Sequence, residues 1–272
     1  MIGFVGSSLP CAPKTSSYIQ QCPSKSLQYT FHARTSHRVA SNKLYMSGVN
    51  GGIDYDLDIS ELPESVASHV KYVQGGPDSP TALIEAAYAI AQSKIPSTLP
   101  VLVDMLGFNN PIAANIAIDA LVEAKQRSIP FLLKGVGAFN YAVSAYALRA
   151  LGRIRDPSVV DICIECAKSG PIPNVRRAAC NSLSLLEFTS NNDLHRAATL
   201  FAELLGDYDW SVRYASIAAI ENLITMTNSK QDIQVDLITP LKKVAGEDVD
   251  PTVSHRAALA LAALDTILAV KA

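Results

Sequence analysis

The chain has 272 residues, of which 49% are hydrophobic and 18% charged, with 23 basic and 25 acidic side chains. This length and hydrophobicity allow a sizeable core in one or two domains, which excludes disorder throughout. The near balance of charge argues against nucleic-acid binding through a basic surface, and no apolar run approaches the ~20 residues of a membrane-spanning helix. Few aromatic residues (7%) and abundant alanine favour closely packed helices over a β-sandwich.

The first 50 residues differ in composition from the rest. They carry five basic residues, nine serines and no acidic residue, which leaves 18 basic and 25 acidic residues in the remainder. A basic, serine-rich, acid-free leader without a compact apolar stretch is typical of an organelle transit peptide, and the start Met1–Val5 is similar to plastid presequences with an early phenylalanine. We therefore predict a disordered plastid transit peptide over residues 1–50 and a folded domain over residues 51–272. A plain disordered tail is the alternative for the leader.

An internal repeat emerges when six eleven-residue segments are aligned without gaps. The segments begin at Pro80, Pro111, Tyr141, Pro173, Trp210 and Pro251. Their seventh and tenth residues are always alanine or serine, and positions 3, 7, 10 and 11 share one face of a helix. Helix-start signals such as Asn110-Pro111 and Asp250-Pro251 open the segments. Each segment is therefore predicted to be a helix whose small residues let a neighbouring helix approach closely.

A second apolar helix is predicted before each segment. These first helices are expected at Glu64–Gln74, Thr98–Leu106, Ile129–Val136, Ser158–Lys168, Leu194–Leu205 and Ile233–Ala245. Polar loop residues at Thr189–Asp193 and Thr227–Gln231 account for the longest repeat spacings. Two helices in every ~30–40 residues, repeated six times, predict an all-α fold: a HEAT-like α-solenoid, a right-handed superhelix of about six helix pairs.

Positions 5 and 9 of the segments point away from the small-residue face. They carry Tyr88, Asn115, Asp119, Arg149, Arg177, Asn181, Tyr214 and His255 among apolar residues. An ordinary solvated face is richer in lysine and glutamate, so we predict a ligand-binding groove along this stripe, with a plain exposed face as the alternative. Two further arginines at position 4, Arg176 and Arg213, are predicted to be structural and to pair with an aspartate of the adjacent turn.

Three cysteines lie outside the leader: Cys163, Cys166 and Cys180. An odd number without a regular framework is not a disulfide scaffold. The C-x-x-C pattern of Cys163 and Cys166 lies in an apolar helical stretch, without the second ligand pair of a zinc site or the strand-then-helix setting of a redox motif. We therefore interpret these cysteines as helix packing and predict no metal.

Several segments resemble the E/F-type phycobilin lyases, and the F-like subunit in particular. The most discriminating are Leu106–Pro111, Phe139–Val143 and Asp209–Ala215, within a resemblance that spans residues 60–265. It implies a heterodimer of an E-like and an F-like HEAT subunit. Such a lyase attaches a linear tetrapyrrole, a phycobilin, through a thioether to a cysteine of a phycobiliprotein, typically the phycocyanin α subunit. The bilin is a substrate, no cofactor of its own is expected, and the leader then places the protein in the plastid stroma near phycobilisomes.

The resemblance implies roles for the stripe residues. Arg149 and Arg177 are predicted to bind one bilin propionate each through a bidentate fork. Asp119 is expected to hydrogen-bond the central pyrrole nitrogens of a protonated bilin, and His255 to relay a proton. The two stripe tyrosines offer stacking surfaces and the two asparagines complete the groove. The nucleophile is the acceptor's cysteine, so no catalytic cysteine is needed in this chain.

Two alternatives remain open from the sequence. The chain fits a non-catalytic HEAT chaperone or assembly factor for phycobiliproteins, and the bilin site could lie mostly on the E-like partner. Attachment and removal of the bilin are one reaction in opposite directions, and the residues do not distinguish them. A metal-dependent HEAT hydroxylase is excluded because it needs His-Glu pairs, and His69, His195 and His255 are not followed by glutamate.

Overall fold

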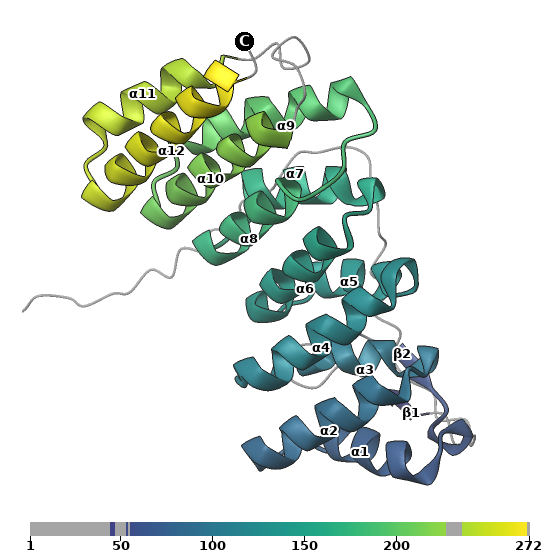
Figure 1. Cartoon of the computed structure of the whole chain (residues 1–272). Coiled ribbons are helices and arrows are strands. Elements are labelled where there is room, and N and C mark those ends of the chain that lie inside the picture. The colour runs from purple at the N-terminus through teal and green to yellow at the C-terminus, as the bar shows by residue number, and fades with distance from the viewer. Residues whose placement is uncertain (1–43, 47–52, 54, 227–235, 271–272) are drawn as a thin grey trace, which may run out of the picture. The chain divides into compact units, whose positions relative to one another are not determined.

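The computed structural model describes residues 44–46, 53, 55–226 and 236–270, and these form six helix pairs. The helices are α1 (Glu64–Gln74), α2 (Pro80–Ser93), α3 (Leu99–Met105), α4 (Pro111–Glu123), α5 (Ile129–Val136), α6 (Tyr141–Ile154), α7 (Val160–Ser169), α8 (Pro173–Leu183), α9 (Asn191–Leu204), α10 (Trp210–Met226), α11 (Ile238–Glu247) and α12 (Pro251–Val270). Over the described ranges, no helix combines the length and apolarity that a bilayer crossing requires. The predicted α-solenoid is confirmed (Figure 1).

The second helix of every pair begins at the first residue of an eleven-residue segment. Local capping explains this agreement. The Asn110 side-chain oxygen accepts the backbone N–H groups of Ile112 and Ala113 at the start of α4, and the Asp250 carboxylate accepts the N–H of Thr252 at the start of α12. Such caps accept hydrogen bonds from the first backbone N–H groups of a helix, which have no partner within the helix. A few neighbouring residues therefore determine where the helix begins.

The first helices agree with prediction to within two residues in four pairs and differ in two. The residues 191–193, expected in a loop, form the first turn of α9, because the Ser190 hydroxyl accepts the N–H of Asn192 and caps the helix there. Helix α11 begins at Ile238, later than the predicted Ile233. The predicted loop Thr227–Gln231 lies outside the described residues.

Small residues set the spacing of the second helices. The seventh residue of every segment is fully buried, and each second helix packs against the next one along the chain, from α2 to α12 (Figure 1). Helices α6 and α8 approach closely at Gly152, where an added Cβ would lie 2.6 Å from the Cα of Ser182. The Ser182 hydroxyl donates to the carbonyl of Leu148 at 2.7 Å, which ties the two helices together.

A short antiparallel strand pair, β1 (Leu44–Met46) and β2 (Tyr55–Leu57), precedes α1. Ile53, Tyr55 and Leu57 are buried, and the backbone N–H of Ile53 donates to the buried Asp104 carboxylate of α3 at 2.9 Å. Burial raises the pKa of Tyr55. The segment therefore packs on the first helix pairs. Strand β1 lies within residues 1–50, the range predicted as a transit peptide; the rest of that range is outside the described residues.

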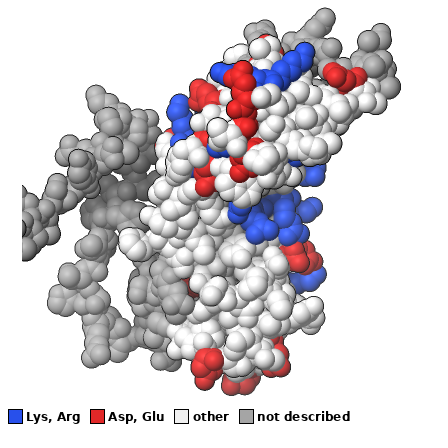
Figure 2. Space-filling model, turned by 90° about the vertical axis from the view of Figure 1, so that its left-hand side faces the viewer, with Lys and Arg blue, Asp and Glu red and all other residues white. Residues whose placement is uncertain are grey.

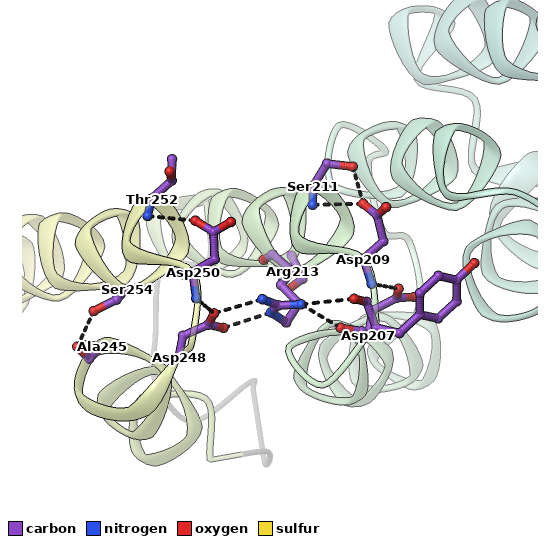
Figure 3. A network of polar contacts seen from close by, with 11 residues as sticks. Asp207, Asp209, Ser211, Arg213, Ala245, Asp248, Asp250, Thr252 and Ser254 are labelled. Atoms are coloured by element: carbon purple, nitrogen blue, oxygen red, sulfur yellow. Dashed lines mark hydrogen bonds and ion pairs between the residues drawn. The ribbon is translucent and has the colours of Figure 1, made fainter.

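The arginines at position 4 form a buried ladder in the C-terminal repeats, and Figure 3 shows the part around Arg213. Arg176 donates Nε and Nη2 to the Asp207 carboxylate at 2.8 and 2.9 Å, and Arg213 makes the same fork to Asp248 at 2.8 Å. Arg213 also donates Nη1 to the carbonyl oxygen of Asp207 at 3.0 Å. The hydrogen bonds from Arg213 lower the pKa of Asp248. The predicted structural role of these arginines is confirmed.

Candidate functional site

All eight stripe residues lie on second helices and have exposed side chains. Tyr88 lies on α2, Asn115 and Asp119 on α4, Arg149 on α6, Arg177 and Asn181 on α8, Tyr214 on α10, and His255 on α12. They occupy the side of each helix opposite the buried seventh position. Because neighbouring second helices contact one another, the stripe crosses the whole row from α2 to α12.

The row of second helices is too long for all eight stripe residues to lie close together. Packed helices lie 8–10 Å apart, so Tyr88 on α2 and His255 on α12 are about 40–50 Å apart along the row. The two residues predicted as catalytic, Asp119 and His255, are four helix spacings apart, about 30–40 Å. The structure therefore does not bring Asp119 and His255 to one reacting centre. It does place Asp119, Arg149 and Arg177 on the consecutive helices α4, α6 and α8.

Exposed cationic side chains are concentrated at the centre of the stripe. The guanidinium of Arg149 lies over the ring of Tyr146, 5.4 Å from its centroid, and Arg177 donates Nη2 to the Asn174 side chain at 2.8 Å. Figure 2 shows a group of basic side chains at mid-height, beside a largely uncharged surface and above a few acidic side chains, with further basic side chains at the top of the view. Each arginine is thus held by a neutral neighbour and keeps its charge available to an anion from solution.

Arg153 is a site residue that the sequence reasoning missed. It lies on α6 and donates Nη1 to the Asp119 carboxylate of α4 at 2.7 Å, with about half of its side chain exposed. Arg153 follows Arg149 by four residues, so both lie on one helix face. Inspection of the positions one turn beyond the segment, rather than positions 5 and 9 alone, would have found it.

The C-terminal end of the stripe has its own contacts. The guanidinium of Arg256 on α12 lies 5.8 Å from the ring centroid of Tyr214 on α10, and the same arginine pairs with Glu221. Tyr214 is therefore packed against a cation of the next helix, whereas Tyr88 is more than half exposed at the other end of the row.

A shallow pocket of about 170 Å³ lies away from the stripe. Val136, Tyr141, Ser144, Cys166 and Val175 are among its lining residues, which come from α5 to α8, and none of the eight stripe residues takes part. Sites that enclose a small organic molecule usually measure ~300–1,000 Å³. This pocket is too small for a tetrapyrrole, whereas the eight exposed stripe residues form an open surface.

The cysteines are packing residues. Cys163 and Cys180 are buried and Cys166 is half-buried. Burial raises the pKa of all three thiols, that of Cys166 to about 11, so they stay protonated at neutral pH. In the part of the chain that the structure describes, no three histidine, cysteine, aspartate or glutamate residues are grouped to hold a metal ion.

Comparisons with known proteins agree with this architecture. HEAT repeats match residues 129–221. The "phycocyanobilin lyase subunit beta" of Nostoc sp. is 34% identical over 189 residues, which cover 67% of this chain and 92% of that protein. The "phycobilisome maturation protein" of Synechococcus elongatus is 30% identical over 190 residues, 67% of this chain and 90% of that protein.

The solved complex of CpcE and CpcF of phycocyanin lyase from Nostoc sp. contains a chain with the same fold. That chain is 34% identical, with a TM-score of 0.54, and the match covers 60% of this chain and 97% of that one. The resemblance inferred from the sequence is thereby confirmed: this chain belongs to the family of phycobilin lyase subunits, and within it to the F-like, or beta, type.

Proposed function

We propose that this chain is the F-like subunit of a heterodimeric lyase that attaches a linear tetrapyrrole to a cysteine of the phycocyanin α subunit. Its relatives carry matching names, among them the "phycocyanin alpha phycocyanobilin lyase CpcF" of Synechocystis sp., which is 33% identical over 54% of this chain and 71% of that protein. The observation that carries the proposal is the group of exposed arginines around Asp119 on α4, α6 and α8.

The chemistry follows from this group. Arg149 and Arg177 bind the two bilin propionates, because a guanidinium matches a carboxylate with two parallel hydrogen bonds. The Asp119 carboxylate accepts hydrogen bonds from the pyrrole nitrogens and stabilises the protonated bilin, which makes its reactive double bond more electrophilic. The acceptor's sulfur then bonds to the bilin carbon, and the thiol proton ends on the bilin. Tyr88, Asn115 and Asn181 extend the same surface.

The open surface explains why a partner subunit is needed. An E-like subunit that covers the stripe excludes water and fixes the bilin relative to the acceptor's cysteine, which favours addition to one face. His255 and Tyr214, too far along the row to act beside Asp119, are assigned to the end of the stripe where the partner or the acceptor makes contact. His255 relays a proton there rather than at the propionate site.

The composition of residues 1–50 supports a proposal on the compartment in which the protein works. Residues 1–50 act as a transit peptide, and the mature protein works in the plastid stroma beside phycobilisomes. The test is the N-terminal sequence of the protein recovered from plastids: a start within roughly residues 40–53 is expected, since cleavage must leave Ile53, β2 and α1 in the chain. Recovery of a protein that still begins at Met1 would contradict the leader assignment.

The function is tested by co-expression of the full chain with an E-like subunit, an apo-phycocyanin α subunit and the enzymes that make the bilin. Covalent attachment is read as zinc-enhanced fluorescence of the acceptor in a denaturing gel, and it should require both subunits. Asp119→Asn should lower the attachment rate at least about tenfold, because the carboxylate's charge is lost. Asp161→Asn, another exposed carboxylate paired with an arginine, is the control. Equal rates for wild type and Asp119→Asn would remove Asp119 from the mechanism.

A second candidate, a chaperone for phycobiliproteins, is favoured by the relative named as a phycobilisome maturation protein. If both subunits fold and associate but phycocyanin and phycoerythrin acceptors stay dark, attachment is not the activity. An increased yield of folded acceptor in the same cells would then support the chaperone.

A further inference from the structure

The ion pair between Arg153 and Asp119 is the starting point. Arg153 Nη1 lies 2.7 Å from Asp119 Oδ1, and the two side chains are 48% and 66% exposed. The pair crosses from α6 to α4 at the centre of the stripe, beside Arg149 on the same face of α6. The carboxylate that the proposed function assigns to the pyrrole nitrogens therefore already has a cationic partner in the free protein.

This pair differs from the buried pairs of the ladder. Arg176 and Arg213 each bind their carboxylate through two nitrogens, donate a third hydrogen bond to a backbone carbonyl, and are at most one-tenth exposed. The contact of Arg153 to Asp119 is made through Nη1 at an exposed position. Water and salt weaken such pairs, and long exposed side chains rotate freely. Arg153 can therefore change its partner, whereas Arg176 and Arg213 are held by burial and by three hydrogen bonds each.

We infer that Arg153 is a positioning residue that exchanges Asp119 for a bilin propionate, an inference that rests on the proposed function. In the free protein, the guanidinium neutralises Asp119. When the bilin arrives, the same guanidinium binds one of its carboxylates beside Arg149. Asp119 is released to the pyrrole nitrogens, so its carboxylate faces a cation both before the exchange (Arg153) and after it (the protonated bilin). Bilin binding and the freeing of Asp119 are one event, so Asp119 is available only when a propionate is in place.

A purely structural role makes a different prediction. If Arg153 only links α6 to α4, its substitution affects the stability of the fold. The effect on binding is then the same for ligands with free propionates and for ligands without them. The two roles are separated by a comparison of the bilin with its dimethyl ester, in which both carboxylates are neutral.

The experiment titrates the full-length chain, bound to its E-like partner, with the bilin and with the dimethyl ester, and follows the visible absorption. Arg153→Gln should weaken binding of the free acid about tenfold, as expected for loss of a charge-assisted contact. It should not weaken binding of the ester, because the variant leaves Asp119 free of its arginine. Arg196→Gln is the control, because Arg196 on α9 forms an equally short exposed pair with Asp161 on α7, at 2.7 Å in the row of first helices, and a second pair with Asp193 on its own helix. It should change neither affinity.

Absorption of the bound bilin adds a second readout. Arg153→Gln should keep the long-wavelength band of a protonated bilin at saturation, since Asp119 is still present, whereas Asp119→Asn should lose it. Equal weakening of acid and ester by Arg153→Gln, or no weakening of either, would overturn the exchange and leave the proposed function standing. If the wild-type complex binds neither ligand, both the proposed function and the exchange are contradicted.

Discussion

The two halves of the solenoid stack in the same way but join their repeats with different polar contacts. In the N-terminal half, α1–α6, the capping asparagines reach back one repeat: Asn110 donates to the carbonyl of Pro80 and Asn140 to that of Gly107. In the C-terminal half, α7–α12, Arg176 and Arg213 reach forward to buried aspartates. Among the described residues, the ion pairs with side chains at most one-tenth exposed lie in the C-terminal half, whereas the pairs Lys94–Glu123 and Arg153–Asp119 of the N-terminal half are exposed. The junctions made by Arg176 and Arg213 should therefore respond more strongly to mutation and to pH than those made by the capping asparagines.

The largest effect is expected from truncation in the C-terminal half. Arg176→Ala removes three hydrogen bonds and leaves the Asp207 carboxylate buried without its fork. Breaking one partner of a buried pair costs about 3–5 kcal/mol, so the free energy of unfolding should fall by that amount in a urea titration followed by circular dichroism. Arg196→Ala, which breaks two solvent-accessible pairs, with Asp161 and Asp193, should cost below about 1 kcal/mol for each. Similar losses for both variants would refute the distinction.

An intermediate effect is expected from acid. Because Arg213 lowers the pKa of Asp248 in the folded chain, the pair stabilises the fold above the unfolded pKa of ~3.9 and this stability is lost as pH falls through the lower, folded pKa. Unfolding titrations between pH 2 and 6 should show stability dropping below about pH 4. Asp248→Asn should reduce that slope while lowering stability at neutral pH. An unchanged slope in the variant would show that other carboxylates carry the acid sensitivity.

The smallest effect is expected in the N-terminal half. Asn140→Ala removes the cap that accepts the N–H of Ala142 and the amide contact to Gly107. Loss of an N-cap costs about 1 kcal/mol, and the loss should be the same at pH 3 as at pH 7, since no charge is involved. A cost for Asn140→Ala that grows between those pH values would show that this junction is coupled to charged groups as well.

The candidate site was predictable in part. The stripe residues could be assigned to an exposed face because positions 5 and 9 of a helix must lie opposite a buried position 7, and the structure exposes all eight. Their grouping could not be predicted. The partner of Asp119 is Arg153, 34 residues away on the next second helix, and the eleven-residue alignment contains no information on how far a long side chain reaches across two helices.

By itself, the sequence determined the elements and their repetition: six helix pairs, six second-helix starts, the small-residue face and the position-4 arginines that bind aspartates. These features depend on neighbouring residues and on the fixed period of the helix. Both can be read from a short stretch of the chain. The tertiary structure alone decided that Asp119 and Arg153 meet while Asp119 and His255 do not, that Gly152 faces Ser182, and that Ile53 and β2 are buried beside the first repeats. Those outcomes depend on the distances between stacked helices, which packing sets and local sequence signals do not contain.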